Sequence, residues 1–132
     1  MIGLDTNVLV RLLVLDDRHQ TETARRIVAE HCSAEEPGFV NLIVLCECVW
    51  VLKSTYGYTS SEIARVIEVL LQASHVTVEA ADLVRSGLRA HASRLGDFTD
   101  VLLAEVNSSR GCEWTATFDK RAAKIPGFQL TR

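Results

Sequence analysis

The sequence has no apolar run long enough to cross a membrane. Its most apolar stretch, residues 39–52, is about a third too short for a transmembrane helix and contains Asn41 and Glu47. The N-terminus lacks the basic region that opens a secretory signal. These absences argue against a membrane-spanning protein and predict a cytoplasmic location.

Metal-binding cysteine pairs and an excess of basic residues are also absent. The cysteines form no CxxC pair, and we expect buried free thiols at Cys32, Cys46, Cys48 and Cys112. The histidines show no ligand spacing and are expected at the surface, at His19, His31, His75 and His91. Fourteen basic and 17 acidic residues give a net charge of -3. This charge argues against a domain that grips nucleic acid by bulk positive charge, but not against one that acts through bound cations.

Short apolar runs alternate with helix-period segments along the whole chain, without a repeat or a linker. The short runs predict strands at residues 2–4, 38–40, 76–78, 114–118 and 128–130. The longer segments predict helices at residues 8–14, 21–31, 42–55, 59–72, 80–95 and 98–109, with a helical turn near Ala122. This alternation predicts an α/β fold, a single domain over residues 1–132 whose parallel sheet is flanked by helices on both faces.

Glu47 is the most informative acidic residue because it is the only residue of segment 42–52 that is not apolar. A helix that is apolar on every side is expected to be buried. A buried carboxylate costs several kcal/mol unless it is paired or bound to a metal. Either a salt bridge to an arginine or one side of a metal pocket would compensate Glu47.

Asp5 and Asp119 each come directly after a predicted strand. The carboxyl ends of parallel strands share one edge of a sheet, and ligands bind beyond that edge. Both acids are therefore expected at this rim, where Thr6 and Asn7 would orient the Asp5 carboxylate. The alternative for each acid is a helix cap, Asp5 for the helix that starts near Asn7 and Asp119 for residues 120–124.

Asp97 and Asp100 lie at the start of the helix predicted at residues 98–109. Their spacing resembles a capping box, and acidic residues favour the positive end of a helix dipole. Capping and catalysis are equally compatible with Asp97. Asp100 is followed by three apolar residues, Val101, Leu102 and Leu103, which favours a role in a site.

Together, these acids lie at the ends or apolar edges of separate elements, which a parallel sheet would bring together. Like charges held close in a protein interior repel strongly, and only a cation or protonation relieves that repulsion. Sites with oxygen ligands only suit Mg²⁺ or Mn²⁺. The sequence therefore predicts a divalent-cation site.

Four motifs in order resemble those of the PIN-domain nucleases, and in particular the VapC-type toxins of bacterial toxin–antitoxin pairs. The opening Ile-Gly-Leu-Asp-Thr-Asn of residues 2–7 looks like the first motif, and Glu47 looks like the second acid. Residues 96–103 look like the third motif, whose invariant acid falls on Asp100, and residues 117–119 look like the fourth, Thr-x-Asp. The motifs cover essentially the whole chain.

The resemblance implies a five-stranded parallel sheet, dependence on Mg²⁺ or Mn²⁺, and cleavage of RNA. It also implies a homodimer and a cognate VapB-type antitoxin that blocks the site, in a hetero-oligomer that binds DNA. Val101 departs from the family, which more commonly has alanine after the third acid. No motif fixes the basic side of the site; Arg11, Lys120 and Arg121 are candidates by position only.

The resulting hypothesis is metal-assisted hydrolysis of RNA phosphodiester bonds. Asp5 and Asp100 are the expected direct ligands of the cation, and Glu47 shares the ion or holds its water. Asp119 and Asp97 complete the ligand shell or form a second site. The side chains expected to fix the ligand geometry are those of Thr6, Asn7 and Thr117.

Two alternatives stay open from the sequence. The first is a PIN-domain nuclease of RNA maturation or decay that belongs to no toxin–antitoxin pair. The second is a phosphoacceptor signalling domain, which also has clustered acids and Mg²⁺. That class needs a pair of neighbouring acids early in the chain, whereas Asp5 is followed by Thr6 and Asn7 and the pair Asp16 and Asp17 lies well beyond it.

Overall fold

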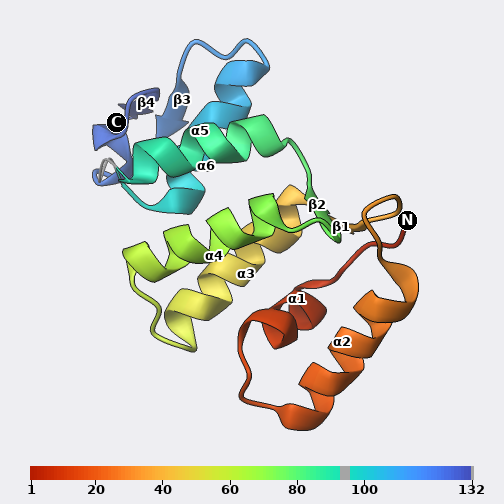
Figure 1. Ribbon diagram of the computed structural model, residues 1–132. Coiled ribbons are helices and arrows are strands. Elements are labelled where there is room, and N and C mark those ends of the chain that lie inside the picture. Colours follow the sequence, from red (N-terminus) through yellow and green to blue (C-terminus); the bar gives the residue numbers. More distant parts are fainter. Residues whose placement is uncertain (93–95, 132) are drawn as a thin grey trace. The chain divides into compact units, whose positions relative to one another are not determined.

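The computed structural model describes residues 1–92 and 96–131, and the chain divides into two compact units, unit 1 (Met1–Glu79) and unit 2 (Ala80–Arg132) (Figure 1). Helices and short parallel strands occur in both units. Within the described residues, no helix combines the length and the apolar character needed to cross a membrane.

Four helices and two strands make up unit 1. They are α1 (Thr6–Leu13), α2 (Arg18–His31), β1 (Gly38–Val40), α3 (Leu42–Ser54), α4 (Ser60–Gln72) and β2 (Val76–Val78). Caps set the helix starts, because the side chains of Asp5 and Asp17 accept hydrogen bonds from backbone N–H groups in the first turns of α1 and α2. The predicted starts at residues 8 and 21 were therefore too late. Thr59 and Glu62 form a capping box at the start of α4, close to the predicted start at residue 59.

The strands of unit 1 form a small parallel sheet. β1 and β2 pair in the register Gly38 to Val76, Phe39 to Thr77 and Val40 to Val78. Gly3 adds a parallel bridge to Phe39 on the other edge of β1. The strand predicted at residues 2–4 is thus present as a single bridge, and Asp5 follows it directly.

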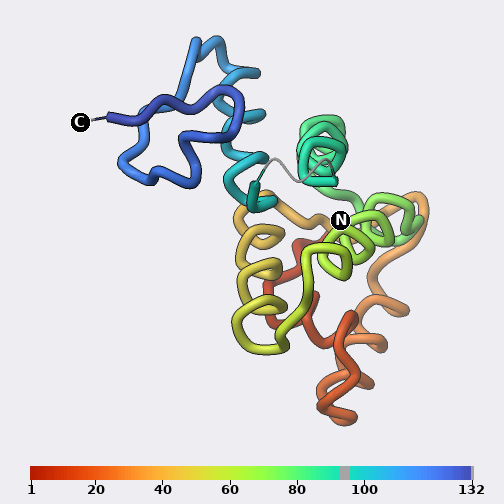
Figure 2. Tube along the Cα trace, turned by 90° about the vertical axis from the view of Figure 1, so that its left-hand side faces the viewer, coloured from red at the N-terminus to blue at the C-terminus, as the bar shows by residue number. Residues whose placement is uncertain are grey.

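The helices of unit 1 pack against one another around a common core. Helix α1 packs against α2 and α3, and α4 packs against α3 and β2 (Figures 1 and 2). Full burial of an aliphatic side chain stabilises a fold by about 1.5–3 kcal/mol. The largest fully buried side chains of this unit are Leu9, Leu45, Leu52, Ile63 and Ile67. This packing fixes the N-terminal end of α1, where Asp5 lies, relative to α3, which carries Glu47.

Unit 2 contains a helix pair followed by a second small sheet. Its elements are α5 (Ala81–Ala92), α6 (Phe98–Ser109), β3 (Thr115–Thr117), the 3₁₀ helix η1 (Ala122–Lys124) and β4 (Phe128–Leu130). α5 packs against α6, with Gly87 close to Leu102: a Cβ at Gly87 would lie 3.6 Å from the Leu102 Cα. β3 and β4 pair in parallel, from Thr115 opposite Phe128 to Thr117 opposite Leu130. The end of the helix predicted at residues 80–95 falls outside the described residues.

The α/β class and the parallel strand pairs are as predicted. Over the described residues the strands form one two-stranded parallel sheet in each unit, so the predicted five-stranded sheet is not confirmed. The strands are three residues long, which is short for strands in globular proteins.

Two expectations about polar side chains were wrong. Of the cysteines expected to be buried, Cys112 is exposed and Cys46 is only half-buried. His91 is 7% exposed rather than at the surface, because it lies on the packed face of α5 with its ring edge-on to Phe98 at 6.0 Å between centroids. Cys32 and Cys48 are buried free thiols as predicted, and burial raises the pKa of the Cys48 thiol to about 12. A thiol with such a pKa stays protonated and unreactive near neutral pH.

Candidate active site

Asp5 caps helix α1 with one of its carboxylate oxygens. The Thr6 backbone N–H donates to Asp5 Oδ1 at 2.8 Å, and the extended backbone of Asp5 (φ -80°, ψ 164°) is typical of an N-cap. The helix-cap alternative for Asp5 is therefore realised. Asp5 is exposed, and within the described residues its other oxygen, Oδ2, has no hydrogen-bond partner. Capping and ligand binding are thus compatible in this residue.

Thr6 connects Asp5 to Glu47. Its hydroxyl donates to Glu47 Oε2 at 2.8 Å, while its backbone N–H is the donor to Asp5. Thr6 is the first residue of α1 and is only 6% exposed, so packing holds its side chain in place. The carboxylates of α1's cap and of α3 are consequently both bound to the same residue.

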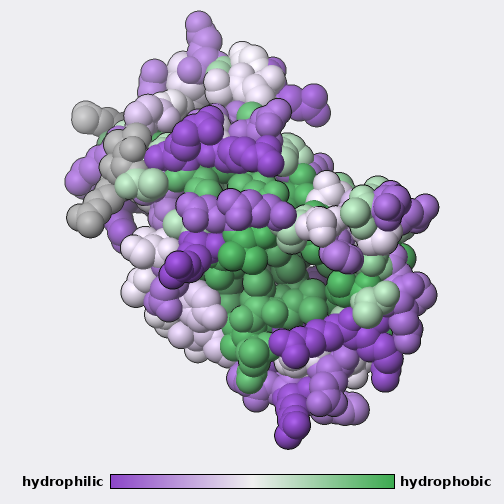
Figure 3. All heavy atoms as spheres, in the orientation of Figure 1, coloured by the Kyte–Doolittle hydropathy of each residue, from purple (hydrophilic) through white to green (hydrophobic). Residues whose placement is uncertain are grey.

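Glu47 itself is exposed, and the prediction that it is buried was wrong. Helix α3 buries one face and exposes the other, where Ile43 (71% exposed) and Trp50 (69% exposed) flank Glu47 at helical spacing. The sequence misled because these exposed neighbours are apolar, so α3 appears apolar on every side. Figure 3 shows hydrophobic side chains at the surface of unit 1. The salt-bridge alternative is wrong for the described residues, where no Lys, Arg or His forms an ion pair with Glu47.

Asp97 and Asp100 lie at the N-terminal end of α6 in unit 2. Asp97 occupies the N-cap position, but its side chain makes no capping hydrogen bond. Asp100 is half-buried in the first turn, where the helix dipole stabilises negative charge. Both residues have other interactions within the chain. The capping-box alternative for this pair therefore lacks its central hydrogen bond.

The segment that leads into α6 is fixed at Gly96. The Gly96 carbonyl can only accept, so His91 Nδ1, which lies 3.0 Å away, is the donor. Gly96 has a φ of +140°, a conformation that side chains rarely adopt, and a Cβ there would lie 2.5 Å from Ile125 Cδ1. These constraints fix the backbone just before α6, and thereby the positions of Asp97 at its N-cap and of Asp100 in its first turn.

We expect Gly96→Ala to lower the free energy of unfolding by about 1–3 kcal/mol, because it forces both an unfavourable φ and an overlap with buried Ile125. The matched control is Gly111→Ala. Gly111 also has a positive φ, +90°, but a Cβ there would meet no atom within 4 Å. Urea unfolding followed by circular dichroism measures both variants. Equal destabilisation by the two substitutions would contradict the role assigned to the contact with Ile125.

Asp119 closes the turn after β3. Its backbone N–H donates to Thr117 Oγ1 at 3.0 Å, and its Oδ1 accepts from the Arg121 backbone N–H at 2.8 Å. The cap alternative is realised here too, with the carboxylate exposed. Thr117 contacts the backbone of Asp119 rather than its carboxylate. Asn7 is exposed and forms no side-chain hydrogen bond with any part of the chain that the structure describes.

A comparison with protein-family models matches the PIN domain to residues 2–127, a segment that contains all five candidate acids. The chain belongs to the PIN domain family. A search of curated proteins finds no match. PIN domains are generally metal-dependent nucleases, so the family supports a hydrolase that acts on nucleic acid.

The acids of this PIN domain offer oxygen donors only. Within either unit, the described residues contain no group of three or more His, Cys, Asp or Glu side chains that could hold a metal ion. In unit 1, however, the carboxylates of Asp5 and Glu47 both accept hydrogen bonds from Thr6. Mg²⁺ commonly binds through one or two carboxylates and completes its shell with water and phosphate oxygens. The donor chemistry present therefore fits the divalent cation that PIN-domain nucleases generally use.

Arg11, one of the basic candidates, is bound by neighbouring side chains of the PIN domain. The Arg11 guanidinium bonds to Asp16 at 2.8 Å and also to Tyr56 and Gln20. The hydrogen bond from the Tyr56 hydroxyl, together with Arg11, lowers the pKa of the Asp16 carboxyl. This network joins the turn after α1 to the end of α3, so Arg11 has a structural role.

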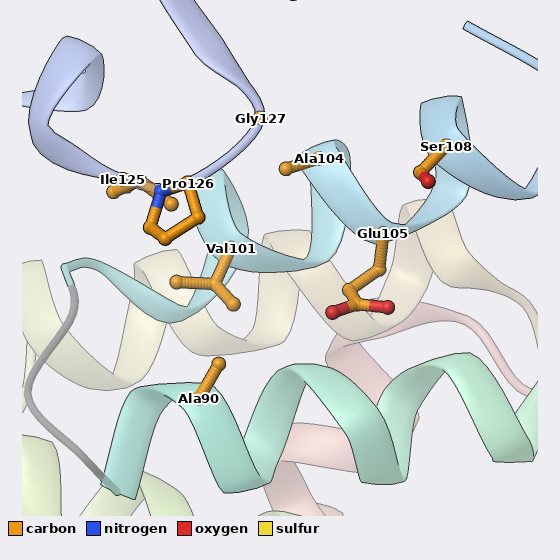
Figure 4. A pocket seen from close by; sticks show the side chains of 8 residues that line it. All are labelled: Ala90, Val101, Ala104, Glu105, Ser108, Ile125, Pro126 and Gly127. Carbon is orange, nitrogen blue, oxygen red and sulfur yellow. The ribbon is translucent and has the colours of Figure 1, made fainter. Parts of the chain in front are cut away.

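A pocket of about 400 Å³ lies in unit 2 between α5, α6 and the turn before β4 (Figure 4). Most of the described residues that line it are apolar, and Glu105 is the only charged one among them. None of the five candidate acids of the PIN domain lines this pocket, which consists of Ala90, Val101, Ala104, Glu105, Ser108, Ile125, Pro126 and Gly127. The five candidate acids therefore do not form this pocket.

Proposed function

We propose that this PIN domain is an endoribonuclease dependent on Mg²⁺ or Mn²⁺. The observation that carries the proposal is the pair of carboxylates on Thr6, since Asp5 and Glu47 come from separate helices and are both hydrogen-bonded to that one buried residue. Two neighbouring carboxylates with no basic partner among the described residues offer the oxygen donors through which Mg²⁺ commonly binds.

Asp5 and Asp100 are the proposed direct ligands of the cation, and Glu47 shares it or holds one of its waters. Asp119 and Asp97 are proposed to complete the shell or to form a second site. When bound, the cation supplies a more acidic water and offsets the charge that builds up on the phosphate. In the hydrolysis, the water oxygen bonds to phosphorus, the bond from phosphorus to the leaving ribose oxygen breaks, and that oxygen takes up a proton.

The proposed biological role is that of a VapC-type toxin, a homodimer inhibited by a cognate VapB-type antitoxin. The support is the set of four ordered motifs that resemble the VapC-type toxins. A nuclease of RNA maturation or decay is the nearest rival, while membership of the PIN family leaves the phosphoacceptor hypothesis without support. An adjacent small gene whose product relieves growth arrest on induction of this chain would favour the toxin; induction without arrest would favour the rival.

The enzymatic proposal predicts that the purified protein cuts RNA in Mg²⁺ or Mn²⁺ and that EDTA stops the reaction. Removing the cation removes both the acidified water and the charge compensation, so the loss should be essentially complete. Sequencing of the cut ends measures the reaction and maps its positions. Asp5→Asn, purified in the same way, is the control for contaminating ribonuclease. Cleavage that persists in EDTA, or that the variant shows equally, would refute the proposal.

A further inference from the structure

One face of β3 in unit 2 is left open, although parallel sheets are normally covered on both faces. Exposure alternates through β3 and the residues that flank it: Trp114 (46% exposed) just before the strand, Ala116 within it and Phe118 (80% exposed) just after it are exposed, whereas Thr115 and Thr117 are half-buried. Side chains two residues apart lie on the same face of a strand. The open face of β3 therefore carries the small Ala116, with an exposed aromatic residue at each end of the strand.

Two basic residues follow this face directly along the chain. Lys120 and Arg121 follow Phe118 on the turn that Asp119 caps, and both are exposed. Neither side chain forms an ion pair or a hydrogen bond with any residue that the structure describes. The C-terminal segment, residues 110–132, is also basic in a chain whose net charge is -3. Its charged residues are Arg110, Lys120, Arg121, Lys124 and Arg132 against Glu113 and Asp119, a net charge of +3.

We propose that this surface, formed by Trp114, Phe118, Lys120 and Arg121, binds single-stranded RNA, with the rings stacking on bases and the cations contacting phosphates. The proposal rests on the proposed ribonuclease function, and it names residues that would hold the substrate rather than cleave it. Exposed aromatic rings on a sheet beside unpaired cations are the combination by which proteins bind single strands.

The spacing of the rings suits separate bases. Trp114 and Phe118 lie at the two ends of β3, which rises about 3.3 Å per residue over its three residues, so they would contact different nucleotides rather than enclose one. Duplex RNA keeps its bases stacked on one another, so it could not use both rings. The surface is therefore assigned to unpaired RNA.

The first test measures binding without cleavage, by fluorescence anisotropy of a labelled single-stranded RNA in the Asp100→Asn background. Phe118→Leu keeps an apolar side chain but removes the ring, and we expect it to weaken binding about tenfold. Phe118→Tyr keeps the ring and should bind as the parent does. Equal affinity of the leucine and tyrosine variants would overturn the stacking role.

The second test addresses the cations through salt dependence. Replacing Lys120 and Arg121 together with glutamine should lower the slope of log Kd against log salt by roughly 1.4, or 0.7 for each lost phosphate contact on a single strand. The control is the same change at Arg25 and Arg26, two exposed arginines on α2. An unchanged slope in the Lys120 and Arg121 variant, or an equal change in the control, would overturn the assignment of the cations.

The outcomes of these tests distinguish a failure of the proposed RNA-binding surface from a failure of the proposed ribonuclease function. A wild-type protein that cuts RNA in Mg²⁺, while Phe118→Leu binds RNA normally, overturns the proposed surface alone. A wild-type protein that neither binds nor cuts RNA overturns the proposed function as well. If Phe118→Leu instead alters self-association, measured by analytical ultracentrifugation, without altering RNA affinity, the face is a protein interface and the proposal is wrong.

Discussion

Asp5→Asn and Asp100→Asn are each expected to lower the rate of RNA cleavage by about a thousandfold or more, because a metal ion contributes several kcal/mol to phosphodiester cleavage. Asparagine has nearly the shape of aspartate but lacks the charge that holds a divalent cation. Single-turnover cleavage of a defined RNA in saturating Mg²⁺ measures the effect. Mn²⁺ binding, followed by calorimetry, should weaken in both variants.

The structure allows the loss of charge at Asp5 to be separated from damage to the fold. Asparagine is as good an N-cap as aspartate, so Asp5→Asn should keep the bond from the Thr6 N–H and change stability by less than about 1 kcal/mol. Asp82→Asn is the matched control, since Asp82 is an exposed acid in the first turn of α5 that pairs with Arg85. Wild-type rates in either Asp5→Asn or Asp100→Asn, or an equal loss in Asp82→Asn, would contradict the assignment.

Local chemistry made most helices and strands of this chain predictable. Residues 42–54 and 98–109 form helices close to the predicted bounds, and Thr59 starts α4 through its capping box. The predicted starts of α1 and α2 are too late because they follow the apolar residues, whereas the caps Asp5 and Asp17 set the starts; of these two caps, the sequence indicated only Asp5. When the first turn of a helix is polar, as it is after Asp17, the hydrophobic periodicity begins later than the helix itself, and the predicted start is late.

The environment of Glu47 was not predictable from its neighbours along the chain. Residue type suggested burial, but exposure depends on which face of α3 the core covers, and that is decided by α1 and α4. The bond from Thr6 to Glu47 joins residues far apart in sequence, and nothing in the sequence beyond the hydroxyl of Thr6 indicates it. The same reason explains His91, whose burial follows from the packing of α5 on α6 rather than from its spacing.

Thr6→Val is expected to lower RNA cleavage by about ten- to hundredfold, the usual cost of removing a group that orients a metal ligand. Valine has the shape of threonine but lacks the hydroxyl that donates to Glu47 Oε2. The backbone N–H that bonds to Asp5 is unaffected, so the change acts on Glu47 alone. The Mg²⁺ concentration for half-maximal cleavage should rise, while Thr6→Ser, which keeps the hydroxyl, should restore most of the activity.

The stability of Thr6→Val distinguishes orientation of a ligand from support of the fold. Glu47 is exposed, so water can replace the lost hydroxyl, and unfolding in urea should change by less than about 1 kcal/mol. A residue that only supports packing would show the reverse, a less stable protein with an unchanged Mg²⁺ requirement. The hydrogen bond from Thr6 can act in catalysis only by orienting the Glu47 carboxylate for the cation. If Thr6→Val cleaves RNA with the wild-type rate and Mg²⁺ dependence, this bond therefore has no part in catalysis.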